Sequence, residues 1–288
     1  MGKIRRRDFL KSGLSLAGII ALNSTSFLNH SDEIKQEVTP FKIKGMSKSG
    51  SASALGYVEV AKGEIDFRVK ESGEYYSVRL QSWPKSNLIR HWYKDQFFIR
   101  AWGKLEGRTL FPKEYHMKTV EDFVNKPDLY TYSSHWYDYS KGEAITEFYQ
   151  KMDAKGKRFN YGKYSARGID ERSKDYISAL MELRFSKPES RTIIVPYNDI
   201  LKGLDIKYLG KDTLKIGNDK YGCIRYYIEL DEEYVGKEAP YKLSFYLHDA
   251  DDRTPLGIFI DKKDNKAKAI YSGSKKDIEN RKGLIPIC

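Results

Sequence analysis

The sequence predicts a mainly β protein, a strongly curved antiparallel sheet or half-barrel with one central helix. Runs of β-branched and aromatic residues alternate with polar ones at a period of two, and Gly, Asp and Asn separate them, as in strands joined by short turns. Only residues 170–185 repeat their apolar positions every three or four residues, as an amphipathic helix does. No helical pattern separates successive strands, which disfavours a parallel sheet and a Rossmann nucleotide site.

The first half of the chain predicts a series of sequential antiparallel strands. Residues 55–61 and 65–69 are expected to flank a turn at residues 62–64. The same alternation predicts further strands at residues 76–80, 96–102, 114–120, 144–152 and 159–165, the last two joined by a hairpin turn at 153–156. The stretch 122–141 resembles an insertion.

The second half begins with the helix. Asp170 or Ser173 could cap its start, and Pro188 prevents it from continuing. Strands then resume at residues 192–195, 204–216, 221–230, 241–248, 256–260 and 266–271. One helix covers only part of the concave face of such a sheet, so aromatic side chains fill the remainder or a ligand cavity is left there.

Aromatic residues make up 14% of the chain, with 22 Tyr, 13 Phe and 4 Trp, which excludes wholesale disorder. They also supply the candidate ligand-binding residues, because rings line apolar grooves and stack on sugars. Core packing is the alternative for any single tryptophan. The candidate set combines the tryptophans with one side of the helix: Trp83, Trp92, Trp102, Trp136, Tyr176, Leu180 and Arg184.

Common catalytic and metal-binding signatures are absent from the sequence, including Gly-x-Ser-x-Gly, His-Glu-x-x-His, Cys-x-x-Cys, a Gly-rich phosphate loop and an EF-hand loop. We therefore predict no catalytic residue, metal site or cofactor. The run 248–253 places His248 beside Asp249, Asp251 and Asp252, which suggests a carboxylate pair or a cation site. Because Asp is also a favoured turn residue, a structural role is the alternative.

Charge and cysteine content exclude other classes of protein. The chain has 51 Lys+Arg and 40 Asp+Glu, a net charge of +11, but its lysines are interleaved with acids, which disfavours nucleic-acid binding. Only Cys223 and Cys288 are present, so a disulfide scaffold and a four-cysteine zinc site are excluded. One bridge between the two cysteines stays open.

The N-terminal residues look like a twin-arginine export signal. Arg6 and Arg7 are followed by one variable residue, by Phe9 and Leu10, and then by a lysine and an apolar run at residues 12–22. That run is about half of the ~20 residues that a membrane-spanning helix needs, so no stable transmembrane anchor is expected. The resemblance implies export to the periplasm by the twin-arginine translocase, with cleavage between residues 21 and 30.

The expected domain organisation is a signal peptide at 1–30, a linker or edge segment at 31–54, and one curved β domain at 55–288. Within that domain the sequence resembles an uncharacterised family of exported bacterial proteins that is known only as a domain of unknown function. The likeness rests on the helix segment 170–184, the glycine turn and strand at 216–230, and the strand, D-x-R-x-P-L and hairpin of residues 246–271. It implies a periplasmic sheet akin to the half-barrels of lipoprotein carriers, whose concave face binds acyl chains.

The leading hypothesis is therefore non-catalytic binding of a hydrophobic or amphipathic envelope ligand. The alternative is a hydrolase or accessory factor that acts on cell-surface polysaccharide through the aspartates of residues 249–252. A third is a structural protein that docks on a partner complex through its basic surface. Ligand identity, cysteine pairing, cleavage site and oligomeric state are left open by the sequence.

Overall fold

The computed structural model describes residues 34–47, 57–70, 72–84, 96–121, 129–152, 159–230, 241–250, 253–261, 265–279 and 281. The twin-arginine motif and the hairpin turn expected at 153–156 lie outside these residues. Lys35–Cys288 is one compact unit. Within the described residues, no helix is both long and apolar enough to cross a membrane.

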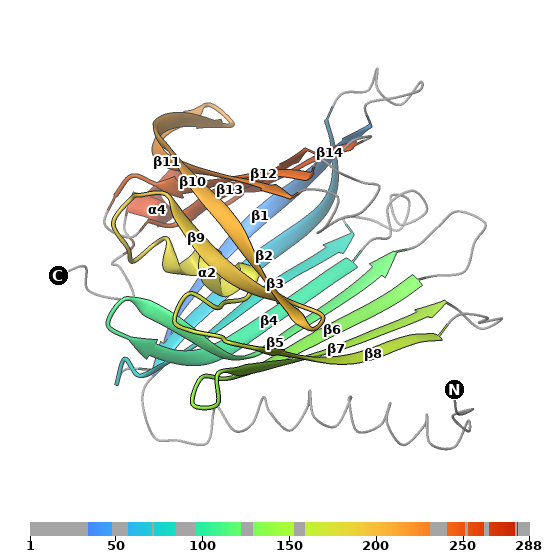
Figure 1. Cartoon of the computed structure of the whole chain (residues 1–288). Coiled ribbons are helices and arrows are strands. Elements are labelled where there is room, and N and C mark those ends of the chain that lie inside the picture. The colour runs from blue at the N-terminus through green and yellow to red at the C-terminus, as the bar shows by residue number, and fades with distance from the viewer. Residues whose placement is uncertain are drawn as a thin grey trace. The chain divides into compact units, whose positions relative to one another are not determined.

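Fourteen strands of the described residues form one sheet (Figure 1). The first eight are β1 (Ile34–Ser47), β2 (Val58–Lys70), β3 (Tyr75–Pro84), β4 (Gln96–Glu106), β5 (Thr109–Glu121), β6 (Leu129–Asp138), β7 (Glu143–Met152) and β8 (Phe159–Arg167). After helix α2 (Tyr176–Glu182) follow β9 (Arg191–Tyr197), β10 (Ile200–Ile216), β11 (Asp219–Leu230), β12 (Tyr241–His248), β13 (Pro255–Asp261), β14 (Asn265–Tyr271) and helix α4 (Lys275–Glu279).

Strand order confirms the predicted antiparallel sheet with a helix in its concavity. The order is β8-β7-β6-β5-β4-β3-β2-β1-β14-β13-β12-β11-β10-β9, so the two ends of the sheet are β8 and β9. These ends approach each other, because β10 contacts β8 and β9 contacts β7. The sheet is therefore nearly closed, like a barrel, and the β9–β10 hairpin passes across its open side in front of α2 (Figure 1).

β1 corrects the expectation of a linker or edge segment before residue 55. It lies inside the sheet between β2 and β14. Phe41 pairs with Tyr271 and Ile43 with Ala269, and Phe41 is 2% exposed. The alternation of buried and exposed residues across this strand was obscured in the sequence by its many lysines and by Pro40, which occupies a strand position without breaking it.

Two further expectations in the first half were wrong. β2 continues through residues 62–64 without a turn. Gly63 is there for lack of space and not to form a turn: a Cβ at this position would lie 2.9 Å from the carbonyl oxygen of Gln81 and 3.1 Å from Ile43 Cδ1. The supposed insertion at 122–141 contains β6, whose residues pair with both β5 and β7. Both errors came from treating glycine and polar residues as turn signals.

α2 is shorter than the predicted helix, and neither proposed residue caps it. Asp175 is the N-cap, and its carboxylate accepts a hydrogen bond from Ser178 N at 2.8 Å. Ser173 instead forms a bridge with Ile194 of β9, and the Asp170 carboxylate accepts from Arg172. The helix begins later because its first residues are used to cover the edge of β9.

The main core lies between α2 and the concave face of the sheet. It holds Phe67, Tyr76, Ala101 and Tyr115 from the sheet and Met181 from the helix, all with at most 3% exposure. A second, smaller cluster of buried side chains contains Tyr221, Tyr246 and Tyr271 together with Ile278 of α4. Burial of each large apolar side chain contributes roughly 1.5–3 kcal/mol.

Candidate functional site

The inner face of the sheet is the face that contacts α2. Tyr76 of β3 marks it, because its hydroxyl shares a 2.8 Å hydrogen bond with Ser178 of the helix. Side chains two residues apart on a strand point to the same side, and directly paired residues of neighbouring strands do so too. This rule assigns every strand position near the helix to the inner face or to the outer face.

Buried ion pairs close the inner face at the helix. Glu182 of α2 lies 3.0 Å from Lys174 Nζ and 3.0 Å from Arg191 Nη1, and it also accepts from the backbone N–H of Leu110 at 2.7 Å. Lys174 donates to the carbonyl oxygen of Leu110 at 2.7 Å. These contacts fasten the helix to β5 on one side and to β9 on the other.

A second buried network follows the helix. Arg184, which is 1% exposed, donates to Glu37 of β1 at 2.7 Å, and Arg281 binds the other oxygen of Glu37 at 2.9 Å. Arg253, from the D-x-R-x-P-L stretch, donates to carbonyl groups at the end of the helical segment, including that of Ser186. Arg184 was a predicted ligand-binding residue, and the structure places it in this internal ion pair.

Asp175 lies at the centre of a buried cluster with Tyr76, Tyr115, Tyr137 and Tyr139. Burial raises the pKa of Asp175 to about 6, although Ser178 donates to it through both its backbone N–H and its hydroxyl group. Burial, followed by the nearby Asp175 carboxylate, raises the pKa of all four tyrosines. The hydroxyl of Tyr139 donates to Ser173 O at 2.7 Å. This cluster forms the floor of the inner face.

His135 of β6 forms a polar strip beside that floor. Its Nδ1 lies 3.0 Å from Thr146 Oγ1, and its Nε2 lies 3.2 Å from Ser133 Oγ. Burial, with a smaller contribution from His116, lowers the pKa of His135 to about 4. The imidazole is therefore neutral at neutral pH, and both of its nitrogens have hydroxyl partners.

Farther from the helix the inner face is apolar and only partly buried. On one side Leu80 pairs with Ile99, and Ile99 pairs with Met117. On the other side Leu243 pairs with Ile260. We call these partly exposed side chains and their neighbours the inner wall: Leu80, Ile99, Met117, Leu230, Leu243, Ile260 and Ala269. Such a surface can bind an apolar chain by removing it from water.

Two of the predicted tryptophans come together, but on the outer face. Trp102 Nε1 donates to Glu114 at 2.9 Å, and Glu114 is paired with Trp136 across β5 and β6. The ring of His116 meets that of Trp136 edge to face, at 5.9 Å between centroids. Hydrogen bonds from His116 and Trp102 lower the pKa of Glu114 against the effect of burial. These tryptophans do not line the inner wall.

The remaining candidates are dispersed. Trp83 is 39% exposed near the end of β3, on the outer face, and Trp92 lies outside the described residues. Leu180 is buried in the main core, and Tyr176 is partly buried and packs against this core. The members of the predicted set that the structure describes therefore lie on different faces of the sheet and in the core.

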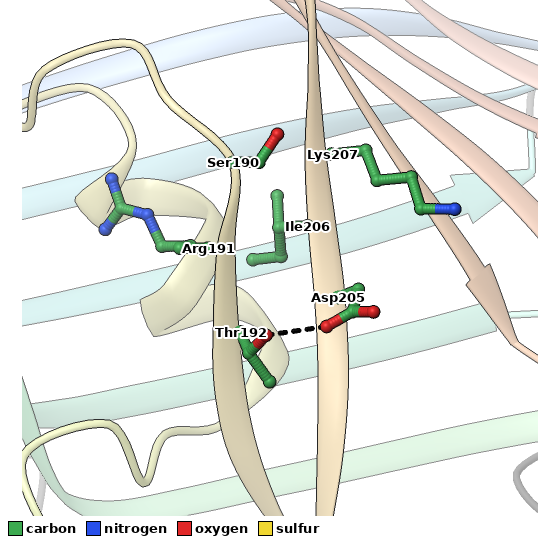
Figure 2. A pocket seen from close by; sticks show the side chains of 6 residues that line it. All are labelled: Ser190, Arg191, Thr192, Asp205, Ile206 and Lys207. Atoms are coloured by element: carbon green, nitrogen blue, oxygen red, sulfur yellow. Dashed lines mark hydrogen bonds between the residues drawn. The ribbon is translucent and has the colours of Figure 1, made fainter.

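The described pocket lies between two strands, and the aspartate run is described only in part. Figure 2 shows the hollow between β9 and β10, where Thr192 donates to Asp205 at 2.6 Å. Asp249 pairs with Lys211 at 2.7 Å on the surface, whereas residues 251–252 lie outside the described chain. Among described residues no group of three His, Cys, Asp or Glu could hold a metal ion.

Sequence reasoning missed Asp175, His135 and the inner wall. Asp175 lay inside the expected helix, where its capping role depends on where the helix begins. Leu80, Ile99 and Met117 of the inner wall each lie in a stretch that the sequence predicts to be a strand. The register that brings these three residues side by side is known only from the structure. His135 stood out only as one of several scattered histidines.

Comparison with known proteins adds a likeness in fold. No family model matches the chain, and no curated protein matches it either. Among solved structures it is similar to a beta-barrel-like protein of a domain of unknown function, DUF1849, from Brucella abortus. The similarity has a TM-score of 0.43 and 10% identity, and covers 82% of this chain and 96% of that chain. At this level, function has to be inferred from this chain's own residues.

Proposed function

We propose that the protein is a non-catalytic binding protein that holds an acyl chain of an envelope lipid against the inner wall. The supporting observation is the inner wall itself. Its apolar side chains all lie on the inner face, one group on β3–β5 and the other on β11–β14, and each keeps part of its surface exposed. Covering apolar surface is worth about 25 cal/mol per Å². A flexible hydrocarbon chain gains from such a wall without directional contacts.

The polar groups of the same face favour binding over catalysis. His135 is engaged through both ring nitrogens, and Asp175 accepts two hydrogen bonds from Ser178. A general base must come within hydrogen-bond reach of its substrate, and Asp175 is only 2% exposed. The hydroxyl groups of Ser133 and Thr146 give the wall a polar border, which suits an amphipathic ligand better than a pure hydrocarbon.

Residues 1–30 supply the cellular context of this proposal. Arg6, Arg7, Phe9 and Leu10 fit a substrate of the twin-arginine translocase, which would deliver the protein to the periplasm. A periplasmic binding protein meets envelope lipids and their precursors. Release of a shortened chain into the periplasmic fraction, and its loss when Arg6 and Arg7 are both changed to Lys, tests this part separately.

Ligand binding is tested first by native mass spectrometry of protein from its own host, followed by organic extraction. A bound lipid is expected. Met117→Gln and Leu243→Gln, one on each side of the wall, should each weaken the binding of dansyl-labelled undecanoic acid severalfold. Leu209→Gln is the matched control, because Leu209 is exposed on β10 outside the wall. Equal binding by all three variants, with no extractable lipid, would refute the proposal.

A further inference from the structure

Three lysines form a row across the outer face of neighbouring strands. Lys44 of β1 is directly paired with Lys268 of β14. Lys62 of β2 lies close to the level of Lys44, because a Cβ on the adjacent Gly63 would be 3.1 Å from Cδ1 of Ile43, the neighbour of Lys44. Neighbouring strands are about 4.8 Å apart, so the three lysine side chains leave the sheet from adjacent positions on one face. We call Lys44, Lys62 and Lys268 the lysine row.

The lysine row is unfavourable for the isolated protein. Like charges directly opposite each other on paired strands destabilise a sheet. Burial, and then the charge of Lys44, lowers the pKa of Lys268. Two carboxylates of these strands have other cationic partners, since Asp261 pairs with Lys266 at 3.3 Å and Glu64 lies 3.7 Å from Arg79. An external anion would relieve the repulsion.

Exposed apolar side chains border the lysine row. Tyr57 and Val58, at the start of β2, are 38% and 43% exposed, and Lys268 Nζ lies 3.7 Å from the centroid of the Tyr57 ring. At the other end, Trp83 is 39% exposed and is directly paired with Lys62. A tyrosine and a tryptophan with lysines between them are typical of surfaces that lie at a membrane interface.

We propose that this surface, formed by the lysine row with Tyr57, Val58 and Trp83, docks on the headgroups of an anionic bilayer. The phosphates would neutralise the three lysines, and the rings and Val58 would enter the interface. Nucleic acid fits less well, because the apolar side chains would gain nothing from it. The inference does not depend on the proposed ligand, but Ala269 of the inner wall is adjacent to Lys268 on the other side of the same strand.

The test compares full-length variants on vesicles of phosphatidylcholine with and without phosphatidylglycerol. Lys44→Gln/Lys268→Gln should weaken partitioning to the anionic vesicles about 30-fold, the factor that about 1 kcal/mol for each lysine gives. Lys202→Gln/Lys207→Gln removes the same charge from β10, where Lys202 Nζ lies 4.6 Å from the centroid of the Tyr197 ring. This control should bind as the unchanged chain does.

Residues 1–33 are present in all variants and could themselves contribute to vesicle binding. Quenching of tryptophan fluorescence reports on the proposed surface alone, because Trp83 belongs to it. Lipids with brominated acyl chains should quench the fluorescence of the unchanged chain, and Trp83→Phe should remove most of that quenching while the protein still binds. Thermal unfolding in solution should show Lys44→Gln/Lys268→Gln to be at least as stable as the unchanged chain. The proposal is overturned if anionic vesicles are not bound, if both lysine pairs matter equally, or if quenching survives in Trp83→Phe.

Discussion

Replacing Asp175 with Asn should remove a pH dependence of stability that the buried carboxyl group creates. Asn keeps an oxygen that can accept from Ser178 N, so the N-cap of α2 is retained. It cannot ionise. The substitution therefore isolates the charge of one buried group at the floor of the inner face from the shape of the site.

The size of the effect follows from the proton affinity of Asp175. Its pKa rises from an ordinary 3.8 to about 6 in the folded protein. Each tenfold change in proton affinity corresponds to about 1.4 kcal/mol, so the folded state gains about 3 kcal/mol from the protonated group. Because the folded pKa is the higher one, this stabilisation is fully present below about pH 4 and is lost as pH rises through about 6.

Urea unfolding between about pH 4 and pH 7 measures this directly. The free energy of unfolding of the unchanged chain should fall relative to that of Asp175→Asn by about 3 kcal/mol over this range. Asp138→Asn is the control: hydrogen bonds from Ser140 and Lys141 lower the pKa of this exposed carboxyl to about 2, so its difference curve should be nearly flat from about pH 4 to pH 7 and should change, in the opposite direction, only below about pH 4. A constant difference between Asp175→Asn and the unchanged chain would refute the reasoning.

Three further outcomes follow from buried or crowded positions. Glu37→Gln leaves the guanidinium of Arg184 without its carboxylate and should lower the free energy of unfolding by about 3–5 kcal/mol in urea. Gly63→Ala should cost about 1–3 kcal/mol in the same assay, whereas Gly45→Ala, with 3.8 Å to its neighbour, should be tolerated. Cys223, whose burial raises its thiol pKa to about 11, should resist a thiol reagent at about pH 8 until the protein is unfolded.

The antiparallel sheet was predictable because short runs rich in β-branched and aromatic residues follow one another along the chain with few helical stretches between them. Residues 221–230 and 241–248 were placed within two residues of β11 and β12, since β-branched, aromatic and other apolar residues are frequent in both stretches. β1 was missed for a physical reason. Its outer positions carry lysines, and β14, the strand that pairs with it, lies more than two hundred residues later in the chain.

The candidate site was less predictable, because it depends on which face each side chain takes. Trp102 belongs to an aromatic-rich stretch and Arg184 to the expected helix, and both features suggested ligand binding. The structure places Trp102 on the outer face beside Glu114 and uses Arg184 to neutralise Glu37 of β1. Register between strands and the partners of buried charges arise from tertiary contacts, which a single sequence does not encode locally.

The neighbouring positions of β1 and β14 affect how the protein can fold. β1 is the first strand to leave the ribosome. Its partner β14, which pairs with Phe41 and Ile43, is complete only when Tyr271 has been synthesised. Until then the growing sheet has an unpaired edge at β1, and closing such a distant pair is slow because of its entropy cost. Chain completion must therefore precede completion of the sheet, and a truncation before β14 should leave an adhesive edge that promotes aggregation.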